Sequence, residues 1–184
     1  MEDTDHRILI NQAIINTAVR FGIAYTSAQA IILAVAHLTG ANPFGPMRFW
    51  ILMLLPVFIF FGLRYLKSFE ISQELSYLSA FRTGSMTSFI GGATSSMLVY
   101  LYTVISGPGV LKRHKAEMQE MLILSEEQLT GVLGKQNLTR MAEEINKITP
   151  GSLAFDDFFQ KIVFGIIISL ILAFFFRKRN TEKH

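Results

Sequence analysis

The 184-residue sequence contains no cysteine and few charged residues. Without cysteine the chain can form no disulfide, no thiolate metal site and no cysteine nucleophile. Only 17% of the residues are charged, and these residues are confined to a few segments. We expect no cleaved signal peptide, because the chain starts with the acidic Met1–Asp5 where a signal peptide would be basic.

Long apolar runs fill the rest of the sequence. Hydrophobic residues make up 51% of the chain and the mean hydropathy is +0.38, both high for a soluble protein. A helix needs roughly 20 mostly apolar residues to cross about 30 Å of hydrocarbon. The sequence therefore predicts an all-α integral membrane four-helix bundle with a helical extramembrane insertion between spans three and four. The predicted parts are a lead-in (1–17), three transmembrane helices (18–109), the insertion (110–157), the fourth transmembrane helix (158–176) and a basic tail (177–184).

Three of the predicted spans carry small residues at four-residue spacing, which places them on one helix face. Such rows let two membrane helices approach closely. We expect the third span to be the axis on which the others pack, and the second span, with Pro56 at its centre, to be kinked and more exposed to lipid. The three rows are Ala18, Gly22, Thr26, Ala30 and Ala34; Gly84, Ser88, Gly92 and Ser96; and Gly165, Ser169 and Ala173.

The predicted insertion reads as short amphipathic helices. Ser125–Gln128 matches a capping box, Asn137 can cap a later helix, and Ser152 can cap the last one, whose early turns contain Asp156 and Asp157. The apolar faces of the insertion can lie on the membrane surface, on a partner or on each other.

A few polar residues lie within or beside the spans. Gln29 is near the middle of the first span and should find a partner on another helix, because an unpaired amide in hydrocarbon is costly. Arg20 and Arg64 are long side chains that can reach the headgroups. These three residues are the candidates for polar contacts inside the membrane.

No motif for catalysis, metal binding or cofactor binding stands out. We find no Asp or Glu inside the predicted spans, no HExxH pattern and no Walker loop. The serines of the third span read as packing residues, because no base accompanies them in sequence. We therefore expect no catalytic residues, no metal, no cofactor and no enzymatic activity. We also expect no nucleic-acid partner, since the basic residues cluster beside apolar runs, as anchors at lipid headgroups do.

Charge distribution predicts the orientation. Four spans put both termini on one side, together with most of the Lys and Arg residues in short segments, so the positive-inside rule places both termini in the cytoplasm. The basic Lys112–Lys115 argues the other way, but it belongs to a long and acidic region that translocates with less regard to charge.

The sequence resembles a family of small bacterial inner-membrane proteins known only as a domain of unknown function. The resemblance rests on the short first hairpin, on Tyr77–Gly84 and Tyr102–Pro108 at the two ends of the third span, on the acidic insertion, and on Gly165–Ala173 followed by Arg177–Arg179. It implies four spans and a bacterial cytoplasmic membrane, and it supplies no activity.

Two hypotheses for function follow. The first is a structural or accessory membrane protein that binds a membrane partner through residues 110–157 or through an outer face of the bundle. The alternative is a small transporter or channel component, which would have to be a homo-oligomer because four spans leave little room for a pore within one chain. The lipid bilayer is the partner in both.

Overall fold

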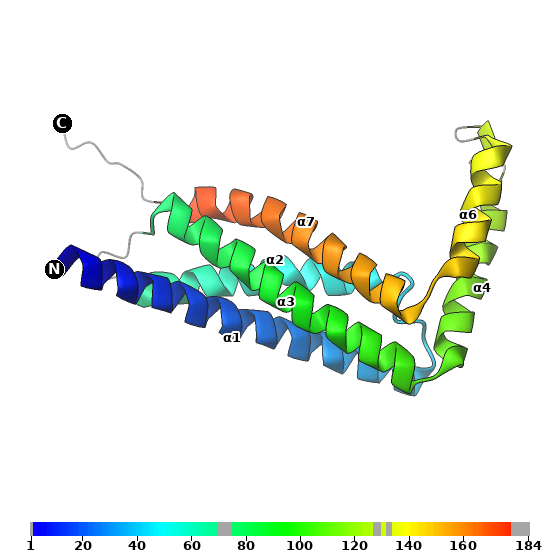
Figure 1. Cartoon of the computed structure of the whole chain (residues 1–184), viewed down its shortest axis with the longest axis horizontal. Helices are drawn as coiled ribbons and strands as arrows, with labels where there is room; N and C mark the ends of the chain where they lie inside the picture. The colour runs from blue at the N-terminus through cyan, green and yellow to red at the C-terminus, as the bar shows by residue number, and fades with distance from the viewer. Residues whose placement is uncertain (1, 70–74, 127–129, 132–133, 178–184) are drawn as a thin grey trace.

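The computed structural model describes residues 2–69, 75–126, 130, 131 and 134–177 as an all-helical chain (Figure 1). Within that part the only β contact is an isolated parallel bridge between Leu75 and Arg177. Residues 127 and 128 of the predicted Ser125–Gln128 capping box lie outside the described residues, as do residues 178–184 of the basic tail. The helices are α1 (Glu2–Thr39), α2 (Met47–Phe69), α3 (Tyr77–Ile105), α4 (Pro108–Leu124), α6 (Lys135–Lys147) and α7 (Pro150–Phe176).

Four of these helices are long and apolar enough to cross a membrane, and they form one bundle. The candidate spans are Leu9–Thr39, Met47–Ser68, Tyr77–Ile105 and Pro150–Phe176. The start of α1 and the end of α7 lie at the same end of the bundle (Figure 1). The prediction of an all-α membrane bundle of four spans with a helical insertion between spans three and four is confirmed.

Helices α4 and α6 form an antiparallel pair at the opposite end of the bundle, which we call the arm. The arm points across the direction of the four spans and not along it (Figure 1). Two bonds from α4 to α6 hold it together: Lys115 Nζ donates to the Asn146 carbonyl at 2.7 Å, and Gln119 Nε2 donates to Asn146 Oδ1 at 2.9 Å. An arm in this direction runs along the surface of a bilayer if the four candidate spans cross that bilayer upright.

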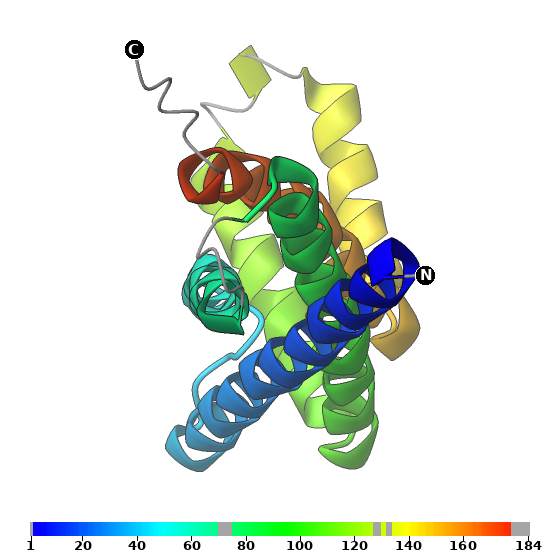
Figure 2. The same ribbon diagram turned by 90° about the vertical axis from the view of Figure 1, so that its left-hand side faces the viewer.

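Helix α3 is the packing centre of the bundle. It contacts α7 most extensively and then α1 and α2, and the view along the bundle shows it between α1 and α7 (Figure 2). The small-residue rows of α3 and α7 face each other: a methyl group added at Gly84 would lie 2.5 Å from Ser169 Oγ, and one added at Gly165 would overlap Ser88. These glycines allow the two backbones to come this close.

The small-residue row of α1 follows the interface for only half of its predicted length. Ala18 and Gly22 are buried, but Thr26 and Ala30 are only half-buried and Ala34 is exposed. An α-helix advances about 100° per residue, so a strict four-residue row turns by about 40° per step and drifts off a straight contact. The residues that keep facing the bundle are instead Tyr25, Gln29, Leu33 and Ala36.

The small-residue row of α7 stays buried along the whole helix because different helices cover it at different heights. Its part near the arm, with Lys161, faces α1 and α3, whereas Gly165 and Ser169 lie near α3 and α2. The buried row of α7 is Leu153, Asp157, Lys161, Gly165, Ser169 and Ala173.

Ser96, the last residue of the small-residue row predicted for α3, is half-buried.

Helix α2 is more buried than expected. The sequence predicted that this span would be the most exposed to lipid, but 39% of its apolar window is buried, more than in the other three spans. Pro56 lies inside the helix. The prediction is wrong because large aliphatic side chains fill the space beside the small residues of α3 and α7: Ile51, Leu55, Ile59, Leu63 and Leu66.

Three helix starts bear on the sequence predictions. The lead-in is continuous with the first span, so α1 starts at Glu2. Helix α3 starts at Tyr77, where Ser76 Oγ accepts from the Ser79 amide. The N-cap of α6 is Gly134, with φ 79°, and not Asn137.

We expect Gly165→Ala to destabilise the bundle by about 1–3 kcal/mol, because the added methyl group overpacks against Ser88. Gly92→Ala is the matched control, since its methyl group would meet α7 side chains at 3.5 Å, an ordinary contact. Thermal unfolding in detergent measures both variants. Equal midpoints for the two would contradict the close approach at Gly165, and Ser88→Gly should restore the Gly165→Ala variant.

Candidate functional site

Lys161 of α7 is buried among oxygen atoms from three spans. Its Nζ donates to Asp157 Oδ2 at 2.5 Å, to Gln29 Oε1 of α1 at 2.7 Å and to Ser95 Oγ of α3 at 2.8 Å. Lys161 is 2% exposed and Gln29 1%. Since an ammonium group has three donors, all of them are satisfied by protein oxygens.

An aromatic ring closes the remaining side of this cluster. Lys161 Nζ lies 5.5 Å from the centroid of the Tyr25 ring, within the range of a cation–π contact. Tyr25 itself is fully buried, and its hydroxyl donates to the Ile51 carbonyl of α2 at 3.3 Å. The Lys161 cluster (Lys161, Asp157, Gln29, Ser95 and Tyr25) therefore connects all four spans.

The cluster lies within the hydrocarbon layer. Helix α7 has 27 residues, which at 1.5 Å per residue is about 40 Å against about 30 Å of hydrocarbon. Lys161 lies about 16 Å along the helix from Pro150, so it is below the headgroups even if all of the excess length is at the arm end. A lone charge at that depth would be costly, and pairing with Asp157 makes the site neutral.

Sequence reasoning found only part of this site. Gln29 does bond to another span, but Lys161 was not considered and Asp157 was assigned to the start of the last helix. That assignment is wrong, because α7 begins at Pro150 with Thr149 as its N-cap and Ser152 as the reciprocal capping residue. Asp157 is past the second turn and pairs with Lys161 one turn later. Extending the Gly165–Ala173 row backwards in steps of four residues would have found Lys161 and then Asp157.

The two arginines that the sequence proposed beside Gln29 lie elsewhere. Arg20 donates to the Tyr65 hydroxyl at 2.8 Å and lies over its ring, which ties α1 to α2 at an exposed position. Arg64 is exposed on α2. Neither residue belongs to the Lys161 cluster.

A second polar group fixes the base of the arm. Asn42, in the loop between α1 and α2, donates to Glu117 Oε2 at 2.6 Å and bonds His114 Nδ1 at 3.2 Å, while its Oδ1 accepts from the Phe44 amide. Burial, and then the nearby Arg48, lower the pKa of His114, against the opposing effect of Glu117. A neutral His114 accepts at Nδ1 from the Asn42 amide, so this pKa direction fits the observed bonds.

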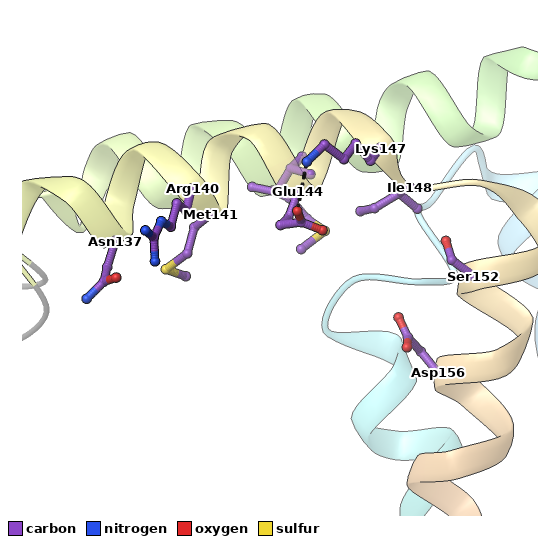
Figure 3. Close-up of a pocket in the computed structure, with 10 residues that line it drawn as sticks. Asn137, Arg140, Met141, Glu144, Lys147, Ile148, Ser152 and Asp156 are labelled. Carbon is purple, nitrogen blue, oxygen red and sulfur yellow. Dashed lines mark hydrogen bonds and ion pairs between the residues drawn. The ribbon is translucent and has the colours of Figure 1, made fainter.

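A groove of about 720 Å³ lies in the corner between α6 and α7. Figure 3 shows Arg140, Met141 and Glu144 on α6 and Asp156 on α7 around it. Glu144 pairs with Lys147 at 2.9 Å. The floor of the groove is apolar: Met118, Met141, Ile145 and Ile148.

Residues 18–178 match a protein family described as protein of unknown function (DUF4199). The chain belongs to this family. No curated protein and no solved structure matches the chain. The match extends over all of α2, α3, α4, α6 and α7 and most of α1, so the bundle, the Lys161 cluster and the arm all lie in the DUF4199 domain.

In this DUF4199 domain the hydrogen bonds of the Lys161 cluster hold α1, α3 and α7 in fixed positions relative to one another. The three donors of the ammonium group are bonded to Asp157, Gln29 and Ser95, so the ammonium group holds no open position toward a ligand. Among the described residues no group of three or more His, Asp or Glu side chains converges as metal ligands do. The chemistry available at the cluster is hydrogen bonding that fixes three spans to one another.

We expect Lys161→Met to lower the stability of the bundle by about 3–5 kcal/mol, because it leaves Asp157 buried without its partner. The double variant Lys161→Met/Asp157→Leu should recover most of that loss, since no uncompensated charge remains. Unfolding by sodium dodecyl sulfate in mixed micelles measures both. If the double variant were as unstable as the single one, the loss of stability would not come from the unpaired charge of Asp157.

Proposed function

We propose that this protein is a structural or accessory protein of the bacterial cytoplasmic (inner) membrane, without enzymatic activity, that binds a protein partner through the arm tip. The arm tip is the end of α4 farthest from the bundle together with Glu126 just beyond the helix: Glu120, Met121, Ile123, Leu124 and Glu126. The membrane itself follows from the four apolar spans. The partner and the compartment are the proposal.

The observation that carries the proposal is the exposure of apolar side chains at the arm tip. Ile123 is 68% exposed and Leu124 78%, and both lie outside the candidate spans. Adjacent exposed apolar side chains on an extramembrane helix mark an interaction site when polar residues border them.

The charge of the arm tip selects the kind of partner. Glu120 and Glu126 are exposed, and within the described residues neither carboxylate has a hydrogen bond or an ion pair. Two free carboxylates beside an apolar pair disfavour an anionic lipid surface and favour a protein segment with both apolar and basic residues. The acidic composition of the insertion agrees with such a partner.

Charge distribution also supports the proposed orientation, with both termini in the cytoplasm and the arm on the opposite side. Arg64 and Lys67 end α2 and Arg82 follows the start of α3, all at the end of the bundle where α1 begins (Figure 1). Basic residues of short segments favour the cytoplasmic side.

A small oligomeric transporter or channel component is the second candidate. The buried Lys161–Asp157 pair favours it, because ionisable residues inside a membrane mark ion and proton pathways in many proteins. The same contacts argue against it, since all three donors of Lys161 are already bonded to protein oxygens. We therefore place the accessory function first.

Photo-crosslinking in the native membrane tests the arm tip. A crosslinking amino acid at Leu124 should form a protein adduct, and Glu120→Lys/Glu126→Lys should reduce that adduct about tenfold, as expected when two charge contacts become repulsive. Lys112, exposed at the base of the arm, is the matched control position and should form no such adduct.

Two results would contradict the proposal. One is an adduct at Leu124 with lipid alone. The other is a protein adduct whose yield is unchanged by reversing both charges, which would indicate random collision at an exposed apolar side chain.

A further inference from the structure

The arm is joined to the four spans by two chain connections and few helix contacts (Figure 1). One connection leads from α3 into α4 through Gly107, with φ 76°, and the other leads from α6 into α7 through Thr149. Within the described residues α6 packs chiefly on α4, and α4 makes only slight contact with α3. Side-chain contacts with the loop between α1 and α2 therefore hold the arm in its direction.

A single side-chain amide of that loop holds α4. Asn42 Nδ2 donates to Glu117 Oε2 and faces His114 Nδ1, two atoms that lie one turn apart on α4. Asn42 Oδ1 accepts from the Phe44 amide in the same loop, which fixes the orientation of the side chain. Because the NH₂ group is the side that faces α4, His114 Nδ1 must be the acceptor and must carry no proton. We call these three residues (Asn42, His114 and Glu117) the arm-base contact.

A protonated His114 cannot keep the arm-base contact. An imidazolium has N–H groups on both ring nitrogens, so its Nδ1–H would point at the NH₂ group of Asn42. Reversing the Asn42 amide is unfavourable, because its oxygen would then face the Glu117 carboxylate and its NH₂ group would face the Phe44 N–H. A charged His114 would instead attract the Glu117 carboxylate and draw it away from Asn42.

Two charged side chains act on His114 from different helices. Burial comes first and Arg48, at the start of α2, second among the causes that lower the pKa of His114 below its usual 6.5, whereas Glu117 on α4 itself opposes them. His114 binds a proton less readily with the arm in place than with the arm free. The stabilisation from the arm-base contact is thus complete above about pH 6.5 and is lost as the pH falls below it.

Uncharged side chains cover the imidazole ring from the other helices. The Phe44 ring lies 5.8 Å from the His114 ring, and it packs in turn beside Tyr102 of α3 and Leu153 of α7. Tyr102 is the titratable residue that α3 brings to this corner, and a tyrosine hydroxyl stays neutral well above the range in which histidine titrates.

The two basic neighbours of His114 on α4 are bonded elsewhere. Arg113 donates to the Gly40 carbonyl, and Lys115 donates to the Asn146 carbonyl. The first bond ties α4 to the α1–α2 loop and does not involve His114, so the arm would be loosened and not detached when the arm-base contact breaks. The second bond keeps α4 and α6 together as the arm moves.

We propose that the arm-base contact is a pH-sensitive attachment, which holds the arm in one direction when His114 is neutral and lets it turn about its two chain connections when His114 is protonated. Histidine is the side chain whose ordinary titration falls in this pH range. Protonation would change where the arm tip points, and the proposal does not depend on what binds there.

Distances between two spin labels in lipid nanodiscs test the proposal. Cysteines replace Trp50, at the start of α2, and Glu143, on α6, which are both exposed in a chain without other cysteines. We expect a narrow distance distribution at about pH 8 that broadens toward about pH 5, with its midpoint below about pH 6.5. His114→Gln should lose this transition. His37→Gln is the matched control, since His37 is another histidine at the arm end of the bundle, and it should keep the transition.

Charge variants separate the titration of His114 from other effects of acid. Arg48→Gln removes a charge that opposes protonation and should move the midpoint to higher pH, whereas Glu117→Gln removes one that favours it and should move the midpoint to lower pH. Asn42→Ala removes the contact and should give the broad distribution at both ends of the range. The unfolding midpoint of each variant is measured in parallel.

Five results would each overturn the proposal. The parent could keep one distribution across the range, His114→Gln could keep the transition, or His37→Gln could lose it. Arg48→Gln and Glu117→Gln could move the midpoint in the same direction. Lastly, Asn42→Ala could keep the narrow distribution at about pH 8, where the neutral His114 is expected to accept from Asn42.

Discussion

The close approach of α3 and α7 is the constraint on which the rest of the structure depends. Gly84 and Gly165 remove the side chains that would hold the two helices apart, and the serines opposite them fill the space that remains. This contact fixes the rotation of α7 about its axis, and that rotation turns Lys161 toward α3 and α1. A different rotation would expose an ammonium group to hydrocarbon, which is costly in a membrane.

The Lys161 cluster fixes the register of helices whose other contacts are made by apolar or small side chains. Apolar rows can slide or rotate at small cost in lipid, because neighbouring lipid chains are as apolar as the helices. Three hydrogen bonds from one ammonium group, to α1, α3 and α7 itself, hold a single register. The arrangement explains how α1, whose small-residue row drifts off the interface, is nevertheless fixed against the bundle through Gln29.

The sequence predicted the four spans, the insertion and the role of α3 because these follow from local patterns of hydropathy and spacing. It missed Lys161 because the lysine lies inside a long apolar run and was not considered separately. It missed Asp157 because the start of the last helix was placed too close to this residue. The burial of α2 and the direction of the arm could not be predicted. Both depend on how side chains far apart in sequence, such as Asn42 and Glu117, meet in the folded chain.

In the arrangement that we propose, the arm lies along the membrane surface, with one face toward lipid and the opposite face toward water. The most direct test is spin-label accessibility in lipid nanodiscs, with single cysteines at positions 141 and 143, which the cysteine-free chain makes simple. Two residues apart on a helix point about 200° apart. The label at 141 should be accessible to oxygen and shielded from a water-soluble nickel chelate, and the label at 143 should show the reverse. Equal access of the chelate to both labels would contradict the account.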